Sequence, residues 1–136
     1  MTLHITQIPD WQATPACLPD LTATAVHVWR ANLHCNATQL LQLQRLLSPD
    51  EITRAQRFKF PRHQHRFIAA RGMLRQLLAR YLQQSAADIV FQYTPQGKPH
   101  LQANAAIYFN VSHSNDWALY AIGTHPLLGI DIEYIM

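Results

Sequence analysis

The sequence predicts an α+β domain in which a mainly antiparallel sheet packs against one long helix. The longest amphipathic segment, roughly residues 62–83, has the apolar spacing of a helix. Residues 107–111 and 117–122 instead have the pattern of strands, joined by a polar turn around Asn115 and Asp116. Helical segments therefore occupy the middle of the chain and strands its later part.

The composition fits a single domain, residues 1–136, with its own core, because 49% of the 136 residues are hydrophobic and 14% charged. The net charge of +3 suits an anionic small molecule or an acidic protein partner and is too mild to argue for nucleic acid. Cys17 and Cys35 form no Cys-x-x-Cys pair, so neither a disulfide framework nor a thiolate metal site is predicted.

The chain begins without the pattern of a signal peptide, and no apolar run is long enough to cross a bilayer. We therefore expect a cytoplasmic protein without a membrane partner.

The first third of the chain predicts an arm, a strand and a short helix. Residues 1–24 are rich in Pro, Thr and Asp and should form an irregular arm with at most one short strand. Residues 25–31 alternate polar and apolar side chains, which favours a strand. Asn36 or Thr38 should cap a helix over residues 39–47.

A second helix should begin at Ser-Pro-Asp-Glu, residues 48–51, and run to about Phe58. This motif combines a capping Ser, Pro at the first helical position and Glu three residues after the cap. Pro61 then opens the long helix. Its apolar side chains fill one broad arc, expected to face the core: Phe67, Ala70, Leu74, Leu77, Leu78, Tyr81 and Leu82. Its opposite side carries Arg62, Arg66 and Arg80, which should be solvated.

Two arginines of the long helix interrupt this apolar pattern. Arg71 falls inside the apolar arc, and Arg75 lies close to it. A buried guanidinium needs an anion or several carbonyl groups, because an unpaired buried charge is costly. Two kinds of partner stay open on this evidence: a protein carboxylate in a structural ion pair, or a ligand phosphate.

The remaining elements are predicted strands. Residues 87–93 should form one, followed by a turn at residues 95–97. The last strand should span residues 127–135, where Asp131 and Glu133 point to one side. Two adjacent carboxylates repel and favour a shared cation such as Mg²⁺. Spacing alone favours a solvated pair, and it is the other segments of the chain, described next, that favour the metal site.

Three segments in order resemble the surfactin-type 4′-phosphopantetheinyl transferases. They are Gln-Gly-Lys-Pro-His-Leu at 96–101, Phe-Asn-Val-Ser-His-Ser at 109–114 and Gly-Ile-Asp-Ile-Glu at 129–133. A looser match runs from Leu47 through the long helix, so the resemblance covers roughly residues 45–135. It implies one half of the transferase fold.

The activity implied by this resemblance is Mg²⁺-dependent transfer of 4′-phosphopantetheine from coenzyme A to a serine of an apo acyl or peptidyl carrier protein. Mn²⁺ is an alternative ion. The resemblance implies two metal ligands, Asp131 and Glu133. It also implies five residues that bind the cofactor, Arg54, Arg71, Lys98, Ser112 and His113, of which His113 is the catalytic candidate.

Two details qualify this site. Ser112 and His113 are adjacent on a strand and therefore face opposite ways, so they cannot form a nucleophile–base dyad. Arg54 stands where the family tends to place a basic residue for the 3′-phosphate, but Glu51 stands where some members carry another.

One departure from the family concerns length. Members normally have two similar halves, and the second supplies a third acidic metal ligand and a Trp-x-x-Lys-Glu helix. This chain contains no Lys-Glu dipeptide. It is therefore expected to be the amino-terminal half, as a truncated chain, a proteolytic product or a shortened gene. Alone it should be inactive, and it should self-associate or pair with a second half.

Other classes of function stay open as alternatives. One is a non-catalytic module of the same fold that binds phosphate or coenzyme A or pairs with another chain. A more distant one is a nucleic-acid-binding domain, which is disfavoured by the low charge and by the expected lack of a basic patch interleaved with aromatic residues.

Overall fold

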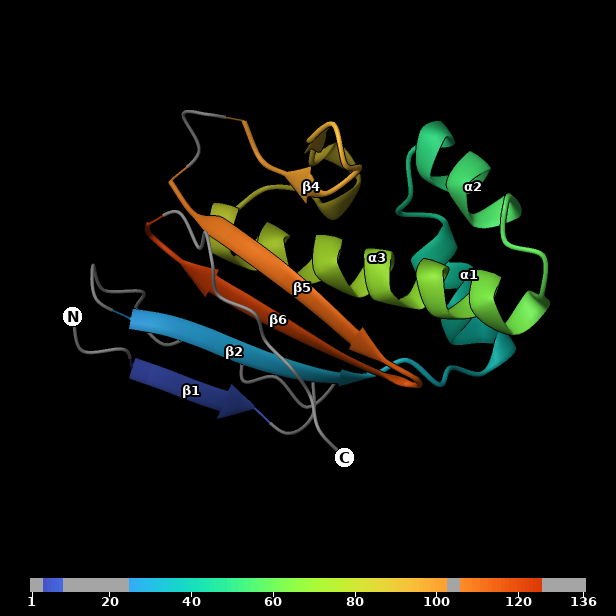
Figure 1. Ribbon diagram of the computed structural model, residues 1–136, viewed down its shortest axis with the longest axis horizontal. Coiled ribbons are helices and arrows are strands. Elements are labelled where there is room, and N and C mark those ends of the chain that lie inside the picture. Colours follow the sequence, from blue (N-terminus) through green and yellow to red (C-terminus); the bar gives the residue numbers. More distant parts are fainter. Residues whose placement is uncertain (1–3, 9–24, 103–105, 126–136) are drawn as a thin grey trace. The chain divides into compact units, whose positions relative to one another are not determined.

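The computed structural model describes residues 4–8, 25–102 and 106–125 of the chain (Figure 1). The chain divides into two compact units, residues 1–30 with 90–136, and residues 31–89. We call them the sheet unit and the helical unit. Helices and strands segregate between them, which confirms the α+β class. The expectation of a single domain stays a prediction.

The sheet unit contains a four-stranded sheet with the order β1-β2-β6-β5. Its strands are β1 (His4–Ile8), β2 (Ala25–Asn32), β5 (Tyr108–Ser114) and β6 (Trp117–Gly123). Strands β5 and β6 pair antiparallel, whereas β1 and β2 pair parallel. Three predicted strands, at 25–31, 107–111 and 117–122, are confirmed; the predicted last strand at 127–135 lies outside the described residues.

A tight turn connects β5 to β6. Ser114 pairs with Trp117, so the loop consists of Asn115 and Asp116 alone. Asn115 has a φ of 52°, in the left-handed region that asparagine tolerates better than most residues. The polar turn predicted at these two residues is confirmed.

The core of the sheet unit is built on its inner strands. Strand β6 is buried from Ala118 to Gly123, as expected for a strand flanked on both sides, by β2 and β5. Trp29 of β2 is only 1% exposed and belongs to this core. Phe109 of β5 is also buried, and its ring meets that of Phe91 edge-on at 5.8 Å.

A second, two-stranded sheet pairs β3 (Gln92–Tyr93) with β4 (Pro99–His100). The prediction of a strand over 87–93 is wrong in its first part, because Ala86–Asp88 form a 3₁₀ turn, η1, in the helical unit. Only the last two residues of the predicted strand pair with another strand. The cause is a set of hydrogen bonds to the long helix, described below.

The helical unit consists of α1 (Ala37–Gln44), α2 (Pro49–Gln56) and α3 (Pro61–Leu82). Asn36 caps α1: its Oδ1 accepts from the Gln39 N–H at 2.8 Å, and Gln39 Oε1 accepts from the Asn36 N–H at 3.0 Å. This reciprocal pair selects Asn36 over Thr38 as the cap. All three predicted helices are therefore confirmed, with ends shifted by a few residues.

Helix α3 is buried more completely than one apolar arc predicts. Every residue from Ile68 to Arg75 is buried, whereas Phe67, Tyr81 and Leu82 of the predicted arc are partly exposed. Within the helical unit, α1, α2 and η1 all contact α3. A helix contacted from several directions has no solvated face in its middle, so the predicted solvated side is limited to its ends. None of the helices in the described part of the chain is both long and apolar enough to span a membrane.

Gly72 marks the closest approach of α3 to α1. A Cβ at this position would lie 2.8 Å from Leu43 Cβ and 3.1 Å from Leu43 O. Replacing Gly72 with Ala should therefore lower the free energy of unfolding by about 1–3 kcal/mol, because overpacking outweighs the better helix propensity of Ala. Urea denaturation measures this change. The double variant Gly72→Ala/Leu43→Gly should lose less than the two single losses added together, since glycine at position 43 removes the Cβ and Cδ2 atoms that the new methyl group would meet. Additive losses would contradict the contact.

Candidate functional site

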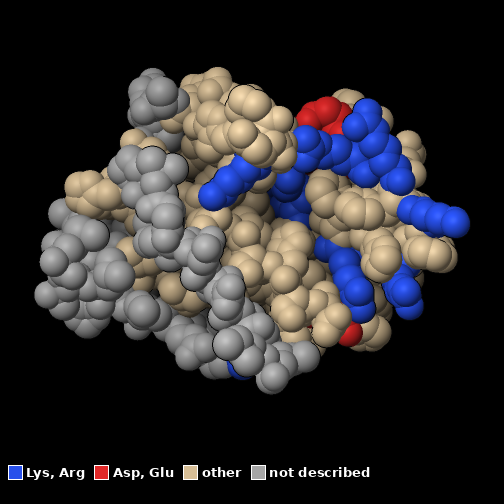
Figure 2. All heavy atoms as spheres, viewed as in Figure 1, with Lys and Arg blue, Asp and Glu red and all other residues tan. Residues whose placement is uncertain are grey.

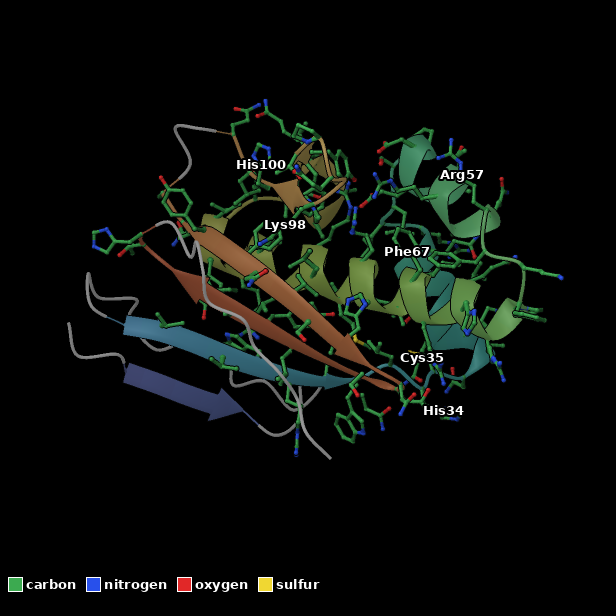
Figure 3. All side chains as sticks on the ribbon, in the orientation of Figure 1. His34, Cys35, Arg57, Phe67, Lys98 and His100 are labelled. Carbon is green, nitrogen blue, oxygen red and sulfur yellow. The ribbon has the colours of Figure 1, made fainter. Side chains whose placement is uncertain are left out.

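The predicted site residues of the sheet unit lie at two hairpins. Lys98 is exposed in the turn between β3 and β4, beside His100 (Figure 3). The turn is closed by the Thr94 N–H donating to Lys98 O at 2.9 Å and the Gly97 N–H donating to Thr94 O at 2.8 Å. Gly97 has a φ of 85°, which favours glycine. The backbone therefore holds Lys98 in a defined turn while its side chain meets solvent.

Ser112 and His113 lie near the end of β5. They pair with Leu119 and Ala118 of β6, so both are in regular strand geometry and point to opposite faces of the sheet. Ser112 is half-buried and His113 is exposed. This geometry agrees with the exclusion of a Ser–His dyad. An exposed imidazole at the end of a strand can donate hydrogen bonds to an anionic ligand.

The predicted metal ligands Asp131 and Glu133 lie outside the described residues, and their assignment stays a prediction. Within residues 4–8, 25–102 and 106–125, no three His, Cys, Asp or Glu side chains form a group that could hold a metal ion. Burial raises the pKa of the Cys35 thiol, so this free cysteine is a poor thiolate ligand at neutral pH.

The helical unit contributes the other two predicted site residues, Arg54 and Arg71. Arg54 is half-buried in the last turn of α2. Arg71 is only 7% exposed in the middle of α3, where its guanidinium also lies 5.1 Å from the centre of the Phe67 ring. The two arginines therefore differ in solvent exposure: Arg54 is partly exposed, whereas Arg71 is buried.

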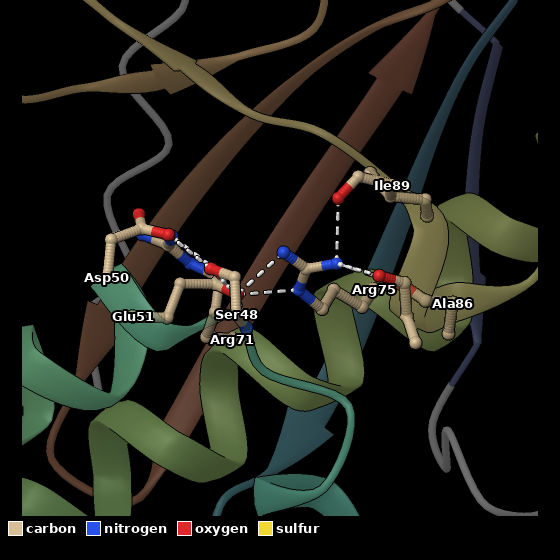
Figure 4. A network of polar contacts seen from close by, with 8 residues as sticks. Ser48, Asp50, Glu51, Arg71, Arg75, Ala86 and Ile89 are labelled. Atoms are coloured by element: carbon tan, nitrogen blue, oxygen red, sulfur yellow. Dashed lines mark hydrogen bonds and ion pairs between the residues drawn. The ribbon is translucent and has the colours of Figure 1, made fainter.

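Arg71 has a protein carboxylate as its partner. Its Nη1 donates to Glu51 Oε2 at 2.9 Å, and the Glu51 side chain is fully buried (Figure 4). Arg75 binds the other oxygen of the same carboxylate: its Nε and Nη2 lie 2.8 and 2.6 Å from Glu51 Oε1. Of the two partners open to Arg71 on sequence grounds, the structure contains the ion pair. Binding of a phosphate by Arg71 remains a prediction.

Arg75 also binds the segment that follows α3, and so connects this segment to the Glu51 carboxylate. Its Nη1 donates to Ala86 O at 2.9 Å and to Ile89 O at 2.8 Å (Figure 4). Two carbonyl groups that accept from the same guanidinium nitrogen must converge on it, so the backbone over residues 86–89 is held in a turn rather than in the extended form of a strand. The predicted strand fails at this point because a distant side chain binds the local backbone.

Glu51 therefore has three roles that its local sequence does not reveal together. Its Oε1 accepts from the Ser48 N–H at 2.8 Å, which completes the predicted capping box of α2. The same carboxylate also forms ion pairs with Arg71 and Arg75. On sequence grounds, Glu51 completes the capping box and stands where some family members carry a basic residue. Its pairing with two buried arginines was not predicted. The available clue was the pair of arginines one turn apart on an otherwise apolar face.

The helical unit carries most of the positive charge of the chain. Nine of the eleven Lys and Arg residues but only three of the eight Asp and Glu residues lie in residues 31–89. In Figure 2 the blue side chains gather over this unit, with few red ones among them. The expected lack of a basic patch interleaved with aromatic residues is wrong, because exposed Phe58 and Phe60 alternate with basic residues over 57–62.

Comparison with known proteins identifies the same family as the motifs. Residues 29–125 match the family model described as "4′-phosphopantetheinyl transferase, N-terminal". The 4′-phosphopantetheinyl transferase HetI of Nostoc sp. is 43% identical over 122 residues, covering 86% of this chain and 52% of the relative. A putative 4′-phosphopantetheinyl transferase of Synechocystis sp. is 37% identical over 68% of this chain and 39% of the relative. The 4′-phosphopantetheinyl transferase Sfp of Bacillus subtilis is 32% identical over 64% of this chain and 38% of the relative.

The matched region contains the whole helical unit and part of the sheet unit, including the turn at Lys98 and the strand end at Ser112 and His113. The chain spans about half the length of HetI and less of the other two relatives. The family predicted from three motifs is thereby confirmed. The chain belongs to the 4′-phosphopantetheinyl transferase family and corresponds to its amino-terminal part.

Proposed function

We propose that the protein containing this chain transfers the 4′-phosphopantetheine group of coenzyme A to a serine of an apo carrier protein. The family match over residues 29–125 carries this proposal, because it includes Lys98, Ser112 and His113 in the predicted order. The cytoplasm is the location we propose for this reaction.

The proposed reaction is a phosphoryl-group transfer. The serine oxygen forms a bond to the pyrophosphate phosphorus that bears pantetheine, and the bond from that phosphorus to the bridging oxygen breaks. The serine loses its proton to a base, and 3′,5′-ADP leaves. Positioning and neutralisation of the phosphate charges supply most of the catalysis in such reactions.

The described residues offer three groups for this charge. Lys98 presents an exposed ammonium group on a hydrogen-bonded turn, and His113 presents an exposed imidazole at the end of β5. Arg54 presents a guanidinium at the end of α2, which suits a further phosphate such as the 3′-phosphate. We assign cofactor binding to these three residues and to Ser112, and charge stabilisation to His113.

The metal assignment belongs to the same proposal. Asp131 and Glu133 are both carboxylates, the ligand type that Mg²⁺ and Mn²⁺ prefer. A bound divalent ion would supply Lewis-acid neutralisation of the pyrophosphate. The rest of the protein would contribute a third ligand, since the matches to this chain cover only 52% of HetI and 38% of Sfp.

Transfer of radiolabelled phosphopantetheine from coenzyme A to an apo carrier protein by the full-length protein tests this function. Replacing Lys98 with Ala should raise the KM for coenzyme A about tenfold without changing the melting temperature, because Lys98 is exposed and its turn is held by backbone groups. Lys98→Arg keeps the charge and should recover most of the affinity.

Residues 1–136 expressed alone serve as the negative control and should transfer no label. Light scattering on the same sample tests the proposed self-association of this half. Binding of coenzyme A without transfer by the full-length protein would instead identify a non-catalytic module, and transfer by Lys98→Ala with an unchanged KM would remove Lys98 from the site.

A further inference from the structure

A short exposed surface of the helical unit combines three cations with two aromatic rings. We call it the basic–aromatic corner: Arg57, Phe58, Lys59, Phe60 and Arg62, between the end of α2 and the first turn of α3. Phe58 is 41% exposed and Phe60 is 48% exposed. The three basic side chains are exposed as well. Two neighbouring exposed phenylalanines surrounded by charge are typical of a binding surface rather than of a solvated turn.

The charge of this corner is not neutralised locally. Among the residues that the structure describes, no carboxylate pairs with Arg57, Lys59 or Arg62. The sequence contains no Asp or Glu between Glu51 and Asp88, and the Glu51 carboxylate is held by two buried arginines. The corner therefore presents an excess positive charge to a partner.

The aromatic rings are held in place by their neighbours. Lys59 Nζ and Arg62 Cζ lie 5.7 and 5.6 Å from the centre of the Phe60 ring. The His63 ring meets the Phe60 ring edge-on at 5.7 Å, and Phe58 packs against Phe67 at 5.8 Å. Contacts of this kind reduce the side-chain entropy that is lost when a partner binds.

We infer that the basic–aromatic corner is a docking surface for an acidic face of a partner protein. Resting on the proposed function, that partner is the carrier protein that receives the phosphopantetheine group. Arginine and phenylalanine are the residue types enriched in protein interfaces, and a guanidinium matches a carboxylate with two parallel hydrogen bonds. Charge complementarity would also accelerate the encounter of the two proteins.

Two other anionic partners fit the geometry less well. A single-stranded nucleic acid binds by stacking its bases on free aromatic faces, but two cations already lie over the Phe60 ring. Attachment to an anionic membrane generally uses a whole amphipathic helix, whereas the exposed phenylalanines here lie within the short segment 58–60.

The test compares a charge-reversed variant with a matched control in the full-length protein. The variant carries Arg57→Glu, Lys59→Glu and Arg62→Glu; the control carries Arg45→Glu, an exposed arginine at the end of α1. Binding of a fluorescently labelled apo acyl carrier protein is measured by anisotropy. The variant should bind about tenfold or more weakly, and the control should bind like the wild type.

Kinetics provide a second readout that a folding defect would not mimic. In the variant, the KM for carrier protein should rise while the KM for coenzyme A stays unchanged. Wild-type binding should weaken between about 0.05 and 0.5 M NaCl, and the variant should lose this salt dependence. A second variant, Arg57→Lys/Arg62→Lys, keeps the charge and should keep the affinity.

Unchanged carrier binding in the charge-reversed variant would overturn the inference. Loss of binding to a labelled single-stranded DNA or to phosphatidylserine vesicles, with carrier binding intact, would overturn it in favour of those partners. Charge-dependent carrier binding by a wild-type protein that transfers no label would support the docking surface and refute the proposed transferase function.

Discussion

Replacing Glu51 with Ala should lower the free energy of unfolding by about 3–5 kcal/mol, because it leaves two buried guanidinium groups without their carboxylate. Glu51 is fully buried, and Arg71 and Arg75 both bind it at hydrogen-bond distances. The substitution also removes the acceptor for the Ser48 N–H at the start of α2. Equilibrium denaturation in urea, followed by circular dichroism, measures the loss.

Asp50→Ala is the matched control. Asp50 is the neighbouring carboxylate, it is exposed, and its Oδ1 accepts a hydrogen bond from the Ser48 hydroxyl. Its removal should change the stability by no more than about 1 kcal/mol. Equal effects at both positions would show that the buried network adds nothing beyond the capping of α2.

The ion pairs of Glu51 also make it possible to test whether Arg71 is a structural residue or a ligand of a cofactor phosphate. Replacing Arg71 with Leu removes one partner of Glu51 and should lower the melting temperature with or without coenzyme A. Arg75→Leu should cost more, because Arg75 also binds the carbonyl groups of Ala86 and Ile89. A drop in melting temperature with unchanged affinity for coenzyme A would remove Arg71 from the cofactor site. Weaker affinity with unchanged stability would support it as a phosphate ligand.

The second large effect concerns the proposed metal ligands. Asp131→Asn in the full-length protein should reduce phosphopantetheine transfer about 10³-fold, because Lewis-acid stabilisation of the transferring group contributes several kcal/mol. The amide keeps the size of the side chain and removes its negative charge. The transfer rate is measured over a series of Mg²⁺ concentrations, together with binding of Mn²⁺ by electron paramagnetic resonance.

Asp116→Asn provides the comparison for this prediction, since Asp116 is an exposed carboxylate in the turn between β5 and β6. It should transfer like the wild type. Wild-type transfer by Asp131→Asn would refute the metal assignment, whereas loss of transfer together with loss of Mn²⁺ binding would support it.

The elements predicted correctly from the sequence are those whose ends are set by contacts between residues close together in the chain. The capping pairs Asn36–Gln39 and Ser48–Glu51 begin α1 and α2, and both follow from spacings of three residues. The β5–β6 hairpin follows from two strand-like runs around a polar turn. These contacts span few residues, so their pattern is visible without tertiary structure.

Long-range contacts were not predictable in this way. The segment at 87–93 has a strand-like composition. However, Arg75 donates to the carbonyl group of Ala86, the residue just before this segment, across a separation of 11 residues. The extent of burial of α3 likewise depends on several elements that pack around it. The apolar spacing along one helix does not indicate how many other elements pack around that helix.

The sequence by itself determined the family, the α+β class, the starts of α2 and α3 and the set of candidate site residues, because motifs and caps are local patterns of chemistry. Only the tertiary structure decided how the charges pair. It assigned Glu51 to Arg71 and Arg75 across separations of 20 and 24 residues, and it left the cations of the basic–aromatic corner without a carboxylate among the described residues. The physical reason is that the environment of a charge depends on what folds around it, and burial turns one carboxylate into a structural anchor while its basic neighbours remain exposed to partners.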